Sequence, residues 1–173
     1  MKKIICLFLS ALFLFSFAAC STSKESPSVS THTEAEETFD FLATDLDGNI
    51  VRFSDYADAK VLMINFWEPW CQPCLSEMPD LENLWSQYKD RGLVILGVFT
   101  STGMDEDIRA VQTQYGISYP LLRGEDERLL ALQTDYVPTT VFVNADGRIL
   151  TQEPIIGAKS LEEYEAMIKE YLR

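Results

Sequence analysis

Two cysteines separated by two residues lie where a run of apolar residues gives way to a helical pattern. They are Cys71 and Cys74, in the segment Trp67-Glu68-Pro69-Trp70-Cys71-Gln72-Pro73-Cys74. Thiol-disulfide exchange proceeds through a thiolate, and a cysteine in the first turn of a helix has its thiolate stabilised by free backbone N–H groups and the helix dipole. The spacing and position of the two residues therefore predict a dithiol/disulfide redox centre.

The other cysteines and the single histidine leave few alternatives to this chemistry. Cys6 and Cys20 lie in the N-terminal segment, and His32 lies in a polar stretch. A structural disulfide is the first alternative, but closing so short a loop gives little stability. A zinc site is the second, and it needs two further ligands, for which the folded part offers no other cysteine or histidine. Redox chemistry at Cys71 and Cys74 is the favoured interpretation.

The N-terminus has the pattern of an export signal. Lys2 and Lys3 precede an almost unbroken apolar stretch over residues 4–19, which is shorter than the ~20 residues of a membrane-spanning helix. The stretch ends in Phe17-Ala18-Ala19-Cys20, which resembles the lipobox of bacterial lipoproteins, where the cysteine is lipidated and becomes the mature N-terminus. We therefore expect a lipoprotein signal peptide at residues 1–19 and lipidation of Cys20, with ordinary secretion or an uncleaved anchor as alternatives.

A change in composition separates this signal from the folded part. Half of residues 21–38 are Ser or Thr, and Val29 is the only large apolar residue among them, which is typical of a flexible segment. We interpret residues 20–38 as the lipidated cysteine and a tether, and residues 39–173 as one domain. The formal net charge of −13, with no basic run after Lys2 and Lys3, argues against a nucleic-acid partner.

Alternating strand and helix patterns predict the elements that position the dithiol. Asp47-Gly48-Asn49 marks the turn of an opening β-hairpin, and the apolar run 61–67 predicts a buried strand that leads into the dithiol. Apolar residues at helical spacing predict a helix over 73–90, bent by Pro79. The order of the elements implies a three-layer α/β/α domain with a mixed central sheet. The remaining predictions are strands at 93–99, 118–122, 139–143 and 148–152 and helices at 108–115, 125–133 and 160–172.

These motifs resemble the thioredoxin superfamily, and within it the membrane-tethered thiol-disulfide oxidoreductases related to TlpA and ResA. The resemblance covers residues 39–172 and implies the thioredoxin fold, with an N-terminal β-hairpin and a strand-helix insert. It rests on Asn65-Phe66-Trp67, the dithiol segment, Glu77-Met78-Pro79, the loop Tyr136-Val137-Pro138-Thr139-Thr140 and the insert at about 101–123.

The two thiols are expected to have unequal roles. Cys71 is at the helix N-terminus and should be the more exposed, so we expect it to attack the substrate disulfide. Cys74, one helical turn on, then attacks the mixed disulfide and leaves a Cys71–Cys74 disulfide. In thioredoxin-like proteins a proline just before the second cysteine, here Pro73, accompanies reducing character. The resemblance therefore favours a reductant over an oxidant that introduces disulfides.

The resemblance also implies a substrate-binding surface beside the dithiol. In the family the proline equivalent to Pro138 is cis and lies against the dithiol, so that the residue before it, here Val137, offers its backbone to a substrate strand. The residues alone would not predict a cis bond, and without the resemblance they favour an ordinary proline that opens a strand. Trp70 directly precedes the nucleophile, and we expect it either to contact substrate or to be a plain residue of the rim.

One position departs from the usual thioredoxin pattern. Thioredoxins place a buried aspartate six residues before the first cysteine, where this chain has Asn65, which is no base. Members resembling ResA instead have a glutamate three residues after the second cysteine, which matches Glu77. Glu77 is expected to move the proton of Cys74, with a solvent-facing helix residue as the alternative. Glu68 is the other nearby acid, and its neighbour Pro69 suggests a position at the rim.

The prediction is a lipid-anchored reductase of protein disulfides on the extracytoplasmic face of the bacterial cell membrane. The resemblance implies re-reduction by a membrane electron donor of the CcdA or DsbD type, and no cofactor or metal is expected. Apocytochrome c and oxidised methionine sulfoxide reductase are both compatible substrates. One alternative is a peroxiredoxin-type peroxidase, which needs a threonine where Glu68 stands. The other is a non-enzymatic lipoprotein that binds a ligand through a thioredoxin-like scaffold.

Overall fold

A computed structural model describes residues 38–173 of the protein. The predicted signal peptide at residues 1–19, the predicted lipidation site Cys20 and the tether up to residue 37 lie outside the described residues. In the part that is described, none of the helices combines the length and the apolar character needed to cross a bilayer.

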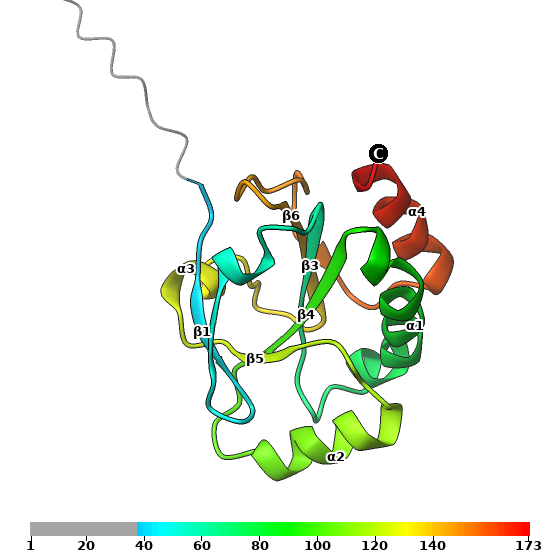
Figure 1. Cartoon of the computed structure of the whole chain (residues 1–173). Coiled ribbons are helices and arrows are strands. Elements are labelled where there is room, and N and C mark those ends of the chain that lie inside the picture. The colour runs from blue at the N-terminus through cyan, green and yellow to red at the C-terminus, as the bar shows by residue number, and fades with distance from the viewer. Residues whose placement is uncertain (1–37) are drawn as a thin grey trace, which may run out of the picture. The chain divides into compact units, whose positions relative to one another are not determined.

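A mixed sheet of seven strands forms the middle layer of the domain (Figure 1). The β3–β4 and β4–β5 pairs are parallel, and the other four pairs are antiparallel. The first two strands form the expected N-terminal β-hairpin. In spatial order the strands are β2 (Ile50–Arg52), β1 (Leu42–Asp45), β5 (Leu121–Arg123), β4 (Leu93–Phe99), β3 (Val61–Phe66), β6 (Thr139–Asn144) and β7 (Ile155–Ile156).

Helices cover both faces of this sheet. They are α1 (Gln72–Tyr88), α2 (Asp105–Tyr115), α3 (Glu127–Leu130) and α4 (Leu161–Tyr171), with short 3-10 turns at Phe53–Tyr56 and Lys89–Arg91. Alternate residues of β3 point to opposite faces. Val61 and Met63 pack with α1, α2 and α4, whereas Leu62 and Ile64 pack in a second cluster with Leu129 of α3. Figure 1 shows α1 and α4 on one side of the sheet and α3 on the other, which confirms the three-layer α/β/α architecture.

The last part of the sheet differs from the prediction. The turn at Asn144-Ala145-Asp146-Gly147 forms, and the Leu150 N–H donates to the Phe142 carbonyl at 2.8 Å. The predicted strand at 148–152 is nevertheless reduced to a single bridge, between Val143 and Ile149. Pairing with β6 resumes only at β7, where Ile155 and Ile156 oppose the start of β6. The chain is thus out of the ladder between Leu150 and β7, a stretch that includes Pro154, which has no N–H to donate.

The predicted helix at 125–133 is also shorter in the structure. Only Glu127–Leu130 is α-helical, and the Asp126 side chain accepts hydrogen bonds from the N–H groups of Arg128 and Leu129. The bonds that follow, such as Leu132 N–H to the Leu129 carbonyl, span three residues and belong to turns. The residues that position the dithiol are unaffected by this difference.

The arrangement of β3 and α1 brings the dithiol to the edge of the sheet. All six residues of β3 are buried, and the strand lies between β4 and β6. Its carboxyl end runs through a tight turn into α1, which begins at Gln72, with Pro73 in the first turn, where a missing N–H costs nothing. Strand ends of this kind are where α/β proteins place their binding and catalytic groups.

Candidate active site

Cys71 and Cys74 lie at the start of α1 and are joined by a disulfide, with their Cα atoms 5.3 Å apart. Cys71 is the N-cap residue of the helix, and its Sγ accepts a hydrogen bond from the Cys74 N–H at 3.2 Å. Of the two side chains Cys71 is the more exposed, at 5% against 1%. An N–H group directed at Sγ stabilises a thiolate there once the disulfide is reduced, because it is one of the free donors of the first helical turn.

The loop before β6 meets the dithiol from the other side. The Val137–Pro138 peptide bond is cis, and the Val137 carbonyl oxygen lies 3.6 Å from Cys71 Sγ. The Pro138 carbonyl accepts a hydrogen bond from the Gly157 N–H at 2.9 Å, which ties this loop to the segment that follows β7. The main chain at Val137 therefore faces the sulfur that the sequence assigns as the nucleophile.

Two exposed aromatic side chains flank this contact. Trp70, next to Cys71, is 61% exposed, and Tyr136, next to Val137, is 65% exposed. Large exposed aromatic residues of this kind are common at surfaces that bind other proteins. The sequence prediction named Trp70 but not Tyr136. Trp67, by contrast, is buried and packs edge-on against Phe99, so it belongs to the core.

Glu77 is buried and accepts hydrogen bonds from other buried polar groups. Its Oε1 accepts a hydrogen bond from Asn65 Nδ2 at 2.9 Å, and its Oε2 accepts from Tyr164 Oη at 3.1 Å and from the Lys159 N–H at 3.2 Å. Asn65 also donates to Thr140 Oγ1 at 3.0 Å. The alternative of a solvent-facing helix glutamate is wrong, because Glu77 is 2% exposed.

Burial and hydrogen bonding have opposite effects on the Glu77 carboxyl group. Loss of solvent raises its pKa and is the larger effect, whereas the hydrogen bonds from Asn65, Lys159 and Tyr164 lower it. The net result is a raised pKa. A carboxyl group of this kind holds a proton at a higher pH than an exposed glutamate does, and it lies one helical turn from Cys74 on the same helix.

Glu68 does not lie at the rim, as its neighbour Pro69 suggested. The side chain is 3% exposed, and its carboxylate accepts hydrogen bonds from the Thr100 N–H and the Thr100 hydroxyl, at 2.8 and 2.7 Å. These bonds hold Glu68 against the loop after β4. Glu68 and Thr100 are about thirty residues apart in the chain, so the residues next to Glu68 could not predict this contact.

Several members of the site were missed at the level of sequence. Asn65 was recognised as a departure, but its role as a hydrogen-bond donor to Glu77 was not predicted. Thr140 and Tyr164 complete the network, with their hydroxyl oxygens 3.0 Å apart. A polar residue at a core position of β6 was the available signal for Thr140, because a buried hydroxyl needs a partner. Tyr164 gave no such signal, since it fits the apolar face of α4.

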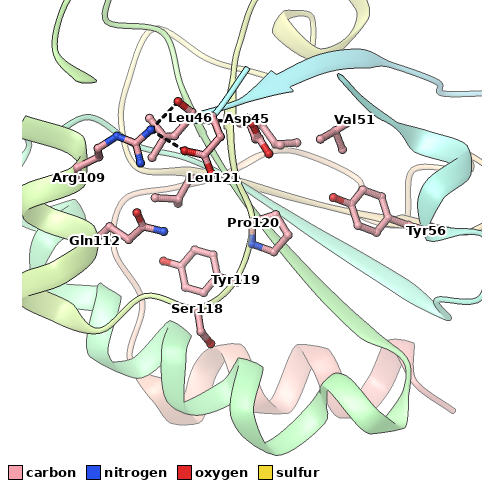
Figure 2. A pocket seen from close by; sticks show the side chains of 12 residues that line it. Asp45, Leu46, Val51, Tyr56, Arg109, Gln112, Ser118, Tyr119, Pro120 and Leu121 are labelled. Atoms are coloured by element: carbon pink, nitrogen blue, oxygen red, sulfur yellow. Dashed lines mark hydrogen bonds and ion pairs between the residues drawn. The ribbon is translucent and has the colours of Figure 1, made fainter. Parts of the chain in front are cut away.

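A separate cavity of about 330 Å³ opens beside the N-terminal hairpin and α2 (Figure 2). Its lining includes neither cysteine, nor Glu77, nor Pro138. The Arg109 guanidinium at its edge is bound to the Leu46 carbonyl and the Asp47 carboxylate, both at 2.7 Å.

Within residues 38–173 there is no group of three or more His, Cys, Asp or Glu side chains placed to bind a metal ion. The groups suited to chemistry therefore gather at the dithiol.

Comparison with known proteins gives a consistent result. The model of the AhpC/TSA family matches residues 35–152. The thiol-disulfide oxidoreductase ResA of Geobacillus kaustophilus is 33% identical over 128 residues, which cover 73% of this chain and 71% of that protein. ResA of Bacillus thuringiensis is 29% identical over 135 residues, which cover 78% and 76%. Among solved structures, an exposed lipoprotein thioredoxin of Streptococcus pneumoniae superposes with a TM-score of 0.61 at 25% identity, covering 76% of this chain and 98% of that one.

Proposed function

Because this chain belongs to the AhpC/TSA family and is a thiol-disulfide oxidoreductase with the thioredoxin fold, we propose that it reduces disulfides of extracytoplasmic proteins through Cys71 and Cys74. The observation that supports this most directly is the position of Cys71 Sγ. It lies between the N–H groups that open α1 and the Val137 carbonyl before the cis bond. A reactive sulfur and an available main-chain group are thus adjacent, as reduction of a peptide disulfide requires.

The reaction has two exchange steps. The Cys71 thiolate attacks one sulfur of the substrate disulfide, so that a Cys71–substrate bond forms and the other substrate sulfur leaves as a thiolate, which takes up a proton. Cys74 then gives up its proton and attacks Cys71 Sγ, which releases the second substrate sulfur. Two electrons and two protons pass to the substrate, and the Cys71–Cys74 disulfide remains.

Glu77 is the proposed proton acceptor in the second step. Cys74 is buried, so its thiol has little access to water as a base. The Glu77 carboxyl group follows it by one helical turn and has a raised pKa caused mainly by burial. A base whose pKa is close to the working pH is effective in proton transfer. Asn65 and Tyr164 hold the carboxyl group in place by donating to its two oxygens.

The substrate surface is proposed to consist of Trp70, Tyr136 and the main chain of Val137. The two aromatic side chains are exposed and are the chain neighbours of Cys71 and Val137, and the Val137 carbonyl is the group proposed to meet an extended substrate segment. Pro138 follows Val137 through a cis bond, and its own carbonyl accepts the Gly157 N–H.

The proposed location is the outer face of the cell membrane, with a lipid on Cys20 as the anchor. The sequence around Cys20 and the likeness to an exposed lipoprotein thioredoxin of Streptococcus pneumoniae support it. In that location the disulfide has to be re-reduced from the membrane, and we propose a donor of the CcdA or DsbD type, which returns two electrons and two protons.

Insulin reduction by the dithiol form tests the activity. The wild-type chain is expected to reduce insulin, whereas Cys71→Ser removes the attacking sulfur and is expected to lose the activity. Wild-type turnover in Cys71→Ser would contradict the assignment of the nucleophile. The position of the redox equilibrium with glutathione distinguishes a reductant from an oxidant. A reduction potential near or below about −270 mV fits the proposal, and one near −120 mV contradicts it.

A trapping experiment identifies the substrate. Cys74→Ser leaves the attacking thiol intact but removes the resolving one, so that the mixed disulfide at Cys71 accumulates. Captured proteins are released with reductant and identified by mass spectrometry. Capture of disulfide-containing envelope proteins by Cys74→Ser, and not by the Cys71→Ser control, is the expected result.

A further inference from the structure

The parallel pairing of β3 with β4 ends just before the dithiol. Its last main-chain bond beyond β3 runs from the Trp67 N–H to the Val98 carbonyl, at 2.9 Å. Pro69 has no N–H and cannot continue the ladder. Thr100 and Ser101 lie on the chain that leaves β4, and their N–H groups donate to a side chain and not to a main-chain carbonyl.

The Glu68 side chain supplies this acceptor. Its carboxylate binds the Thr100 N–H at 2.8 Å, the Thr100 hydroxyl at 2.7 Å and the Ser101 N–H at 3.2 Å. No ion pair involves Glu68 among residues 38–173. A carboxylate has only acceptor sites, so it can accept from all three donors at once. The Glu68 carboxylate is thus almost completely buried, and the groups that donate to it are all neutral.

The same segment presents the nucleophile. The Cys71 N–H donates to the Glu68 carbonyl at 3.0 Å, which closes a turn over residues 68–71. The Trp70 indole N–H donates to Ser101 Oγ at 3.3 Å, so the loop that Glu68 binds also contacts the exposed tryptophan. Glu68 and Cys71 are the two ends of this turn, and the Cα atoms of such ends lie within about 7 Å.

We propose that Glu68 is a positioning residue of the redox reaction: its carboxylate holds the loop Thr100-Ser101 against the turn that presents Trp70 and Cys71, and its negative charge disfavours the Cys71 thiolate. This inference rests on the proposed function, since it concerns the same dithiol. A thiolate exists only in the reduced form, so destabilising it shifts the equilibrium toward the disulfide and makes the dithiol a stronger reductant.

The matched pair Glu68→Gln and Glu170→Gln tests the effect of the charge. The Glu68→Gln side chain keeps an acceptor for Thr100 but has no charge, and Glu170 is an exposed residue of α4, so both variants lose one negative charge. We expect the Glu68→Gln dithiol to be about tenfold harder to oxidise at equilibrium with glutathione, from the Coulomb energy of a charge on a residue of the same four-residue turn. The pKa of the Cys71 thiol, measured as the alkylation rate of the Cys71 peptide against pH by mass spectrometry, should fall in Glu68→Gln and stay unchanged in Glu170→Gln.

A second comparison tests the positioning. Glu68→Ala removes the acceptor, and amide hydrogen exchange of the full chain, followed over residues 99–103, should become faster than in Glu68→Gln. Ser101→Ala removes only the partner of Trp70 and should leave the exchange of Thr100 slow. The proposal is overturned by an unchanged glutathione equilibrium in Glu68→Gln, or by wild-type exchange at residues 99–103 in Glu68→Ala. Neither readout needs a protein substrate, so a wild-type chain that failed to reduce insulin would contradict the proposed function and leave this test intact.

Discussion

The surroundings of Glu77 suit a side chain that takes up and releases a proton. They do not suit one that stabilises the fold through its negative charge. Its two oxygens accept from Asn65, Tyr164 and the Lys159 N–H, yet burial still raises its pKa. The cysteine roles could be proposed from their positions at the start of one helix, and the role of Glu77 from the resemblance to ResA-like proteins together with its place one turn after Cys74. The hydrogen-bond partners could not, because Thr140 and Tyr164 come from β6 and α4, and only the tertiary fold brings their hydroxyl groups together.

Glu77→Gln should slow the release of reduced substrate from the mixed disulfide. Glutamine is similar in shape but cannot accept the proton of Cys74, and loss of a general base typically costs about 10²-fold or more. Single-turnover reduction of insulin measures this step, and Asp80→Asn on the same helix is the control, which should leave the rate unchanged. A Glu77→Gln variant with the wild-type rate would show that Cys74 loses its proton by another route.

The raised pKa of Glu77 also predicts how stability depends on pH. The native state binds the Glu77 proton more tightly than the unfolded chain does, so its contribution to the free energy of unfolding is fully present below the ordinary pKa of 4.5 and is lost as the pH rises through the native pKa. The free energy of unfolding of the wild type, relative to Glu77→Gln, should therefore fall as the pH rises above the ordinary pKa of 4.5. Urea denaturation of the oxidised proteins measures it, and a difference that is constant or rises with pH would refute the prediction.

At the level of elements, the turn after β6 shows what a local pattern can and cannot predict. Asn144 to Gly147 has the composition of a tight turn, and the turn is there because those residues bond to one another. The course of the chain beyond it depends on Pro154 and on the pairing of β7 with the start of β6, which no residue pattern near the turn specifies. The shortened α3 is a similar case, since its length depends on packing rather than on its own residues.

Gly147→Ala should destabilise the domain more than Gly48→Ala does. Both glycines have a positive φ, of +82° and +81°, but a Cβ at residue 147 would lie 2.5 Å from the Phe39 carbonyl oxygen, whereas one at residue 48 would meet nothing within 4 Å. We expect Gly48→Ala to cost about 1 kcal/mol, from the backbone conformation alone. Gly147→Ala should cost about 1–3 kcal/mol more, from steric overlap. Urea unfolding at constant m-value measures both, and equal losses would contradict the prediction.

For the whole molecule, the proposed membrane location depends on a lipid anchor on Cys20, which lies outside the described residues. The fold and its mixed sheet were predictable because strands, helices and the dithiol follow one another in an order typical of α/β domains. Cys20, the proposed point of attachment to the membrane, was predicted from the sequence around it.

Cys20→Ser should release the protein from the membrane while leaving the dithiol domain active. Without the lipid, the described part offers no helix able to span a bilayer, and the lipid is the proposed source of binding. Detergent phase partitioning of cell fractions measures the anchor, and insulin reduction measures the domain. Retention of Cys20→Ser in the membrane fraction would indicate an uncleaved N-terminal segment instead.

The difference in exposure between the two sulfurs bears on how the protein responds to damage. An oxidant from outside the cell reaches Cys71 before Cys74, because Cys74 is almost completely enclosed. Oxidised to a sulfenic acid, Cys71 has Cys74 one turn away, and the two condense to the disulfide with loss of water. We expect this to be faster than further, irreversible oxidation, so that an encounter with peroxide ends in the same disulfide that the proposed reduction of substrates leaves behind.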